Sequence, residues 1–215
     1  MIRFLTLILI LGAQPAFANH PGERLDEVMA KKEPAFEIAD GWHLPELNIK
    51  DQNGIAIRLE DINDQIVFIS FVPQACGDPC VRQQVLLASV QEQVNLSQMK
   101  ELVTFVTVQD PETTIDATWE PYNWMQVLPS DGSTIVSVVE RFSAQSSRDV
   151  ALPMGHVLDR NGRYASVFHG TEFKKTNMTL YANGLVNNAH TKPDAHTPSP
   201  PNEKNWWDWL TDLFK

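Results

Sequence analysis

Cysteine and positive charge are both scarce in this sequence. Two cysteines occur in 215 residues, and no histidine pair has ligand spacing, which makes a structural zinc site with four protein ligands a weak interpretation. Lysine and arginine number 17 against 27 aspartates and glutamates, for a formal net charge of −10, which argues against nucleic-acid binding. Beyond the N-terminus no segment approaches the roughly 20 consecutive apolar residues of a membrane-spanning helix.

The N-terminus has the layout of a secretory signal peptide. Arg3 precedes the apolar run Phe4–Leu11, and the small residues Ala16 and Ala18 flank Phe17. The run is shorter than the roughly 20 residues of a membrane anchor. We therefore expect a signal peptide over residues 1–18, cleavage after Ala18, and a periplasmic protein whose association with the membrane stays open. In such an oxidising compartment, thiols tend toward disulfides unless a reductant or a metal holds them reduced.

Composition divides the rest of the chain into four parts. Residues 19–40 are polar and form a lead-in, residues 41–186 form one domain, and residues 187–203 are proline-rich and predict a disordered linker. Residues 204–215 predict a tryptophan-rich amphipathic helix with four apolar residues on one side (Trp206, Trp209, Leu210 and Leu213). That helix could lie in a membrane interface, dock on a partner or on its own domain, or be an unstructured end.

The domain alternates strand patterns with helix patterns. Asn53-Gly54 between two apolar runs predicts a hairpin. The sequence predicts strands over 44–49, 55–59, 66–72, 102–108, 124–128, 154–158 and 164–168, and helices around 23–32, from Pro79, around 135–142 and over 171–183. This order indicates an α/β fold with a mainly parallel sheet covered on both sides by helices.

The cysteines stand where a buried strand pattern ends and a helix begins. Cys76 and Cys80 are separated by three residues, and Gly77 and Pro79 permit a turn that brings both sulfurs to one point. A structural role for the pair is one interpretation, although closing so short a loop constrains the unfolded chain by only roughly 2 kcal/mol. The position favours chemistry instead, because ligands bind at the carboxyl ends of strands and a helix N-terminus favours thiolate.

Two activities follow from a thiol pair at this position. Cys76, the more exposed thiol, could attack a partner's disulfide and Cys80 could resolve the mixed disulfide. Alternatively, the two thiolates could hold a soft metal, above all Cu(I), together with a third ligand.

Four segments resemble the Sco/SenC family of proteins. Residues 71–84 resemble its strand–CxxxC–helix segment, and residues 104–112 resemble its FVTVDPE strand and loop with one extra residue. Residues 129–142 resemble its next helix, and residues 157–162 resemble its YLIDPDG hairpin. The resemblance spans residues 42–170. It implies a thioredoxin-like central sheet flanked by helices, here with an N-terminal β-hairpin and a flexible C-terminal tail. It also implies copper delivery to, or assembly of, cytochrome oxidase.

The sequence departs from the family pattern at the cysteine loop and at the expected copper ligand. Gly77 and Pro79 replace the family's proline and valine, and Ala151 stands where the family has its copper-binding histidine. The nearest histidine is His156, within a predicted strand. Either His156 serves as the third ligand beside Cys76 and Cys80, or the ligand is lost and copper delivery with it.

Three neighbouring residues add weaker indications. Pro153 occupies the position of the cis-proline that faces the cysteines in thioredoxin-like proteins, and Met154 could add a weak thioether contact to copper. His169 is a weaker candidate ligand. Three hypotheses follow: a Sco/SenC-like copper protein acting on a cytochrome oxidase subunit or another periplasmic thiol or copper protein, a periplasmic thiol–disulfide oxidoreductase, and an interaction module with a structural disulfide.

Overall fold

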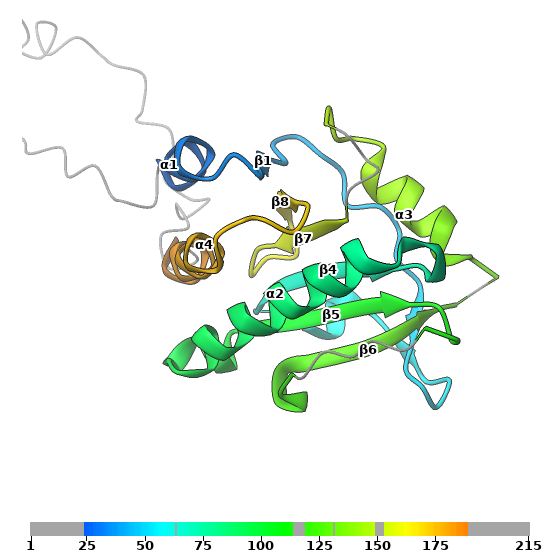
Figure 1. The fold of residues 1–215 in the computed structure, drawn as a ribbon. Coiled ribbons are helices and arrows are strands. Elements are labelled where there is room, and N and C mark those ends of the chain that lie inside the picture. The colour runs from blue at the N-terminus through cyan, green and yellow to red at the C-terminus, as the bar shows by residue number, and fades with distance from the viewer. Residues whose placement is uncertain (1–23, 63, 114–118, 131, 149–152, 189–215) are drawn as a thin grey trace, which may run out of the picture.

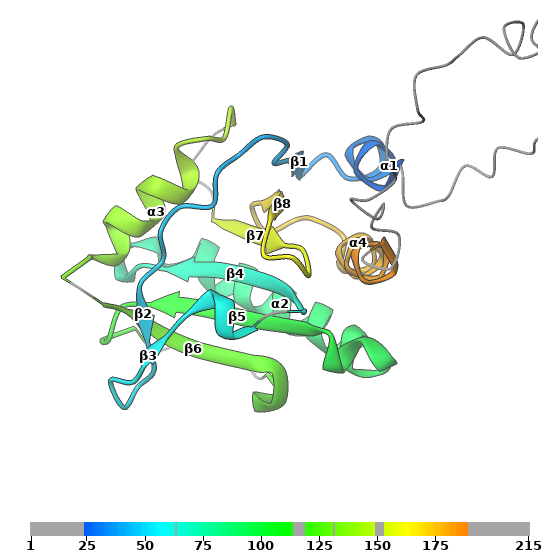
Figure 2. The same cartoon turned by 180° about the vertical axis from the view of Figure 1, so that it is seen from behind.

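The computed structural model describes residues 24–62, 64–113, 119–130, 132–148 and 153–188. In these ranges the chain folds around one central sheet (Figures 1 and 2). The predicted signal peptide, the predicted tail helix and the predicted linker from residue 189 onward lie outside the described residues. Across the described ranges, none of the helices combines the length and the apolar character needed to traverse a bilayer.

The sheet has eight strands in the order β1-β8-β7-β4-β5-β6-β2-β3. Their bounds are β1 Phe36–Ile38, β2 Ile49–Lys50, β3 Ala56–Ile57, β4 Ile66–Val72, β5 Val103–Gln109, β6 Trp124–Pro129, β7 Met154–Leu158 and β8 Tyr164–His169. Every residue of β4 and β5 is buried, as expected for apolar, β-branched strands covered on both faces. These two strands form the centre of the molecule.

The prediction of a mainly parallel sheet was wrong. Only the β4–β5 and β5–β6 pairs are parallel, whereas β7 runs antiparallel to β4 and the other pairs in the described sheet are antiparallel. The cause is the two hairpins, β2–β3 and β7–β8, which add antiparallel strands on either side of a short parallel centre. The sheet is therefore mixed, and the predicted α/β class is confirmed.

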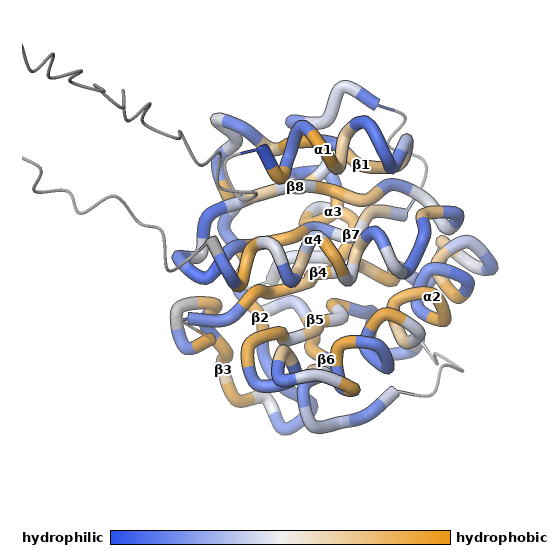
Figure 3. The backbone as a smooth tube through the Cα atoms, turned by 90° about the vertical axis from the view of Figure 1, so that its left-hand side faces the viewer, coloured by the Kyte–Doolittle hydropathy of each residue, from blue (hydrophilic) through white to orange (hydrophobic). Residues whose placement is uncertain are grey.

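Helices cover both faces of the sheet, and each face has its own core. The α-helices are α1 Leu25–Lys32, α2 Asp78–Asn95, α3 Ile135–Ser143 and α4 Lys175–Asn188, and short 3₁₀ turns span Leu59–Ile62, Gln74–Cys76, Gln98–Glu101 and Pro121–Asn123. Residues of α1, α2 and α4 pack with Phe68 and Phe105 on one face. Val138 and Phe142 of α3 pack on the other face. In Figure 3, hydrophilic and hydrophobic segments alternate along α1 and α4, as expected of helices with one buried side.

The folded unit begins earlier than residue 41, the boundary predicted for the domain. The helix expected around residues 23–32 forms as α1, and β1 joins the edge of the sheet beside β8. Phe36 is 1% exposed, with ring centroids 5.2 Å from Phe168 and 4.8 Å from Tyr181. A three-residue strand in a polar stretch has no readable periodicity, so sequence patterns do not reveal that β1 pairs with the sheet.

Candidate functional site

The two cysteines lie in the loop that joins β4 to α2. β4 ends at Val72, the 3₁₀ turn Gln74–Cys76 follows, and α2 begins at Asp78. Cys76 and Cys80 form a disulfide with their Cα atoms 5.7 Å apart. The pair therefore lies where it was expected, at the carboxyl end of a central strand and at the first turn of a helix.

The conformation of Gly77 explains one departure from the family pattern. Its backbone has φ +60° and ψ −141°, a region that glycine enters readily and residues with a Cβ do not. Proline, which the family carries at this point, has φ fixed near −65° and cannot adopt this conformation. The loop between Cys76 and Cys80 thus takes a path that requires glycine.

The two sulfurs differ in accessibility. Cys80 is 2% exposed, and its Sγ lies 3.6 Å from the carbonyl oxygen of Phe71. Cys76 is half-buried and therefore the more accessible of the two. A partner approaching from solvent reaches Cys76 first.

Asp110 holds the cysteine loop in place. Its Oδ2 accepts a hydrogen bond of 2.9 Å from the backbone N–H of Gln74. The contact follows from the parallel register of β4 and β5, in which Val72 lies opposite Gln109. Asp110 was not singled out from the sequence. The signal that could have identified it is that neighbouring parallel strands end at the same edge of a sheet.

A pocket of about 340 Å³ opens beside the disulfide. Its lining comes from the end of β4, the cysteine loop with the start of α2, the first residues of β7, and α3. Its lining is predominantly apolar, and it brings together Phe71, Pro73, Ala75, Cys76, Pro79, Cys80, Val136, Val139, Glu140, Ser143, Pro153, Met154 and His156. Cys76, Cys80 and His156, the residues singled out from the sequence, thus line one cavity, together with Pro153 and Met154.

Pro153 stands next to residues that the structure does not describe. The described residues contain no cis peptide bond, but the bond before Pro153 joins it to Leu152, which lies outside them. The cis-proline therefore stays a prediction. The same holds for Ala151, the position of the family's histidine.

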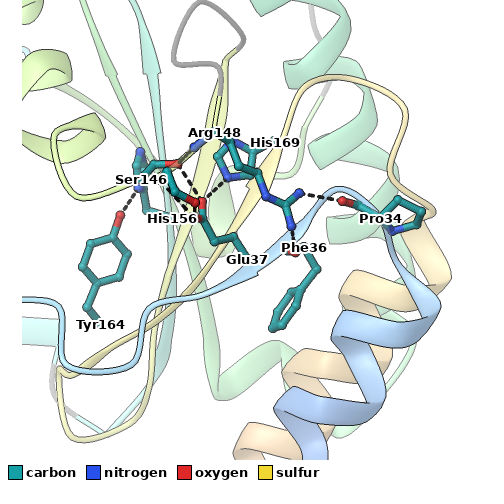
Figure 4. Close-up of polar contacts among 9 residues, drawn as sticks. Pro34, Phe36, Glu37, Ser146, Arg148, His156, Tyr164 and His169 are labelled. Carbon is teal, nitrogen blue, oxygen red and sulfur yellow. Dashed lines mark hydrogen bonds and ion pairs between the residues drawn. The ribbon is translucent and has the colours of Figure 1, made fainter.

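His156 is a buried residue of β7. It is 1% exposed and pairs with Ile69 of β4 in the sheet. Its ring meets the rings of Phe71 and Phe142 edge-on, at centroid distances of 5.3 and 5.1 Å. Its Nδ1 shares a hydrogen bond with the hydroxyl of Tyr164, a contact that the sequence interpretation did not foresee (Figure 4).

Burial keeps the His156 ring neutral. Desolvation first, and the nearby His169 second, lower the pKa of His156 from 6.5 to about 3. Burial, and then the charge of Glu37, raise the pKa of Tyr164 above its ordinary value. At neutral pH the contact is consequently one between a neutral imidazole and a protonated phenol.

His169 forms a hydrogen bond with Glu37 and does not line the disulfide pocket. Its Nε2 lies 2.7 Å from Oε2 of Glu37, on the edge strand β1, and it is not among the residues that line the pocket. Glu37 also accepts hydrogen bonds from Ser146 (Figure 4) and from Ser147, both in the segment that follows α3. Burial alone would raise the pKa of Glu37, but these hydrogen bonds lower it. Arg148 continues the cluster by donating to the carbonyls of Pro34 and Phe36.

In the disulfide state the described residues contain no group of three or more histidine, cysteine or acidic residues arranged to hold a metal ion. Cys76, Cys80 and His156 share the pocket without forming a ligand cluster. The two sulfurs can act as nucleophiles or as metal ligands only after the disulfide is reduced, because the thiolate is the reactive and ligating form.

Comparison with solved structures shows that the chain shares its fold with Sco proteins. BsSco, a member of the Sco family of cytochrome c oxidase assembly proteins in which a disulfide switch was identified, matches with TM-score 0.53 and 12% identity over 67% of this chain and 94% of its own. A SCO1/SenC family lipoprotein from Bacillus anthracis matches with TM-score 0.51 and 16% identity, over 67% and 95%. Yeast Sco1 with copper bound matches with TM-score 0.51 and 10% identity, over 73% and 100%.

These comparisons confirm the fold that the resemblance implied. At identities of 10–16% the likeness establishes the shared architecture and not a shared activity. No protein-family model matches the sequence, and no curated protein matches it. The function must therefore be argued from the site.

Proposed function

We propose that this chain is a Sco/SenC-like periplasmic protein that binds copper through Cys76 and Cys80 and delivers it during the assembly of a cytochrome oxidase. The observation that carries the proposal is that Cys76, Cys80 and His156 line one pocket at the carboxyl end of the central strands. The fold shared with BsSco and with copper-bound yeast Sco1 supports it.

The chemistry of the donor set suits Cu(I) once the disulfide is reduced. Reduction takes up two electrons and yields two thiols, whose deprotonated sulfurs are soft ligands that favour Cu(I). His156 is neutral, as an imidazole ligand must be, and the thioether of Met154 lines the same pocket. The apolar lining limits access of water to the bound ion.

The test is a titration of the reduced protein with Cu(I) in the presence of a competing chelator. We expect one equivalent to bind in wild type, binding to be lost in Cys76→Ser and Cys80→Ser, and affinity to fall by about tenfold or more in His156→Ala. His43→Ala, which removes an exposed histidine outside the pocket, serves as the control. Copper that binds no better to wild type than to a variant without cysteines would contradict the proposal.

A second function is favoured by the unequal exposure of the sulfurs. In a thiol–disulfide oxidoreductase, the Cys76 thiolate attacks a partner's disulfide and one partner thiolate leaves. Cys80 then attacks the mixed disulfide, so that the partner gains two electrons and this protein becomes oxidised. Cys80→Ser should accumulate the mixed disulfide and Cys76→Ser should not. Exchange that survives in His156→Ala, with no stoichiometric copper binding, would favour this function.

The partner in either function is a cytochrome oxidase subunit or another periplasmic thiol or copper protein. We further propose that residues 204–215, which lie outside the described residues, dock on that partner or associate with the membrane. The tryptophans of this segment support the proposal, because such side chains are enriched at both kinds of interface.

A further inference from the structure

Tyr164 is the polar neighbour of His156, the buried histidine that lines the pocket. It is the first residue of β8, it is 6% exposed, and its hydroxyl is hydrogen-bonded to Nδ1 of His156. Trp42, from the segment before β2, packs edge-on against the tyrosine ring with centroids 5.5 Å apart. The tyrosine is thus held by packing from one side while its hydroxyl faces the histidine (Figure 4).

This contact decides which nitrogen of His156 can reach a ligand. Tyr164 lies outside the lining of the disulfide pocket, whereas His156 is part of it. With Nδ1 turned to Tyr164, Nε2 is the ring nitrogen left for a group in the pocket. Phe71 and Phe142 flank the ring edge-on and oppose a flip that would exchange the two nitrogens.

A hydroxyl is suited to this task because it can donate or accept. In one neutral tautomer, Nδ1 accepts from the Tyr164 hydroxyl and Nε2 carries the hydrogen. In the other, Nδ1–H donates to the tyrosine oxygen and the lone pair of Nε2 is free. The second tautomer is the one that a metal ligand requires, and Tyr164 keeps its hydrogen bond to the ring in both.

We propose that Tyr164 is a positioning residue that orients His156 so that Nε2 serves as its copper-binding atom. The inference rests on the proposed function, in which His156 is the third ligand. It adds an outer partner for that ligand, contributed by β8 and locked by Trp42.

The experiment compares Tyr164→Phe with wild type by two measurements. The first is Cu(I) affinity of the reduced protein by chelator competition, where loss of an outer partner should weaken binding by about 10- to 100-fold. The second is the ¹⁵N chemical shifts of His156 in the metal-free protein, which report the tautomer and the hydrogen bond at Nδ1. Tyr164→Phe should move the Nδ1 signal, and the wild-type signal should show Nδ1 hydrogen-bonded.

Tyr181→Phe is the matched control, because it also removes the hydroxyl of a buried tyrosine, one that donates to Asp26 on α1. It should leave both measurements unchanged. If His156→Ala weakens copper binding while Tyr164→Phe binds like wild type, the inference is overturned and the proposed function stands. If His156→Ala itself has no effect, the proposed ligand set fails, and the inference fails with it. The wild-type ¹⁵N shifts test the hydrogen bond even if Tyr164→Phe does not fold.

Discussion

Gly77 shows how much the cysteine loop depends on one residue. A Cβ built at this position would meet no atom within 4 Å, so the constraint is the backbone conformation and not space. A positive φ raises the free energy of the folded state for any residue with a Cβ, because the Cβ comes too close to the backbone. The path of the loop between the two cysteines therefore rests on backbone freedom at residue 77.

We predict that Gly77→Ala lowers the free energy of unfolding by about 1–2 kcal/mol and that Gly77→Pro lowers it further. Urea denaturation of the oxidised protein measures both. Gly155→Ala is the control, since Gly155 has an ordinary φ and its added Cβ would make only ordinary contacts, the nearest at 3.6 Å to Met178. Equal stability of Gly77→Pro and wild type would show that the loop does not have this conformation.

At the residue scale, the sequence predicted which side chains share the pocket but not how they are oriented. The spacing of Cys76 and Cys80 predicts a thiol pair. The distance of His156 from a recognisable hairpin along the chain indicates a candidate ligand. The hydrogen bond between Tyr164 and His156 depends on the register of β7 and β8, which shifts between Val157 and Leu158. Such an irregularity leaves no trace in the pattern of apolar residues.

Among the elements, α2 connects the disulfide to the sheet through buried amides. The helix predicted from Pro79 buries apolar residues such as Leu87 and Val90, and it also buries Gln83 and Gln84 completely. Gln84 donates to Ser70 Oγ on β4 and accepts from Thr107 Oγ1 on β5, each at 3.0 Å. These hydrogen bonds fix the helix that carries Cys80 against two central strands.

Replacing Gln84 with methionine, which has a similar volume, should lower the free energy of unfolding by about 1–3 kcal/mol. The reason is that buried hydroxyls of Ser70 and Thr107 lose their amide partner. Chemical denaturation measures the change. Arg82→Met on the exposed side of α2 should stay within about 0.5 kcal/mol of wild type. If the two variants proved equally stable, the buried amide would not secure the helix.

The junction of α1 and α4 carries a carboxyl group whose titration is linked to folding. Tyr181 on α4 donates to Oδ1 of Asp26 on α1 at 2.7 Å. Burial first, and the charge of Asp40 in addition, raise the pKa of Asp26 above 3.8. The folded state therefore holds this proton more tightly than the unfolded state does. Its contribution to stability is full below pH 3.8 and is lost as the pH rises through the raised folded value.

Asp26→Asn should accordingly increase the free energy of unfolding at pH 7, because the amide stays neutral and still accepts from Tyr181. The gain should shrink as the pH falls toward 3.8, the ordinary pKa of the carboxyl group. Urea denaturation across this pH range tests it. Glu27→Gln, an exposed neighbour on the same helix, provides the comparison. If the increase in the free energy of unfolding caused by Asp26→Asn did not change with pH, a raised pKa of Asp26 in the folded state would be contradicted.

Most helices and strands of the domain could be predicted from the sequence, whereas the pairing of the strands could not. Strands such as β4 and β5 are short apolar runs of β-branched and aromatic residues, and α3 has a clear apolar face with Val138 and Phe142. Phe36 and its strand β1 were missed, because sheet edges are completed by long-range pairing. The antiparallel course of β7 beside β4 also follows from tertiary packing and not from local pattern.

On the scale of the whole molecule, the disulfide pocket is at one end of the sheet, and the described chain ends in α4, which packs on the face opposite α3. The disulfide borders a predominantly apolar pocket on a protein with net charge −10. A partner that presents its thiols or its copper site on a basic surface would be steered toward this protein.

Deletion of residues 204–215 should leave the fold and copper binding intact and should abolish co-purification with the partner or with membranes. Fractionation of cells and pull-down with the full chain as reference measure this effect. A quadruple replacement of Trp206, Trp209, Leu210 and Leu213 by alanine keeps the length of the tail and should act like the deletion. Unchanged fractionation and unchanged pull-down for both variants would remove the docking proposal.

The account of the site is tested most directly by X-ray absorption at the copper edge of the reduced protein loaded with one equivalent of Cu(I). We predict two sulfur scatterers and one nitrogen scatterer in wild type, with the nitrogen lost in His156→Ala and retained in His43→Ala. A first shell without both sulfurs, or a nitrogen that persists after His156→Ala, would contradict a copper site built from Cys76, Cys80 and His156.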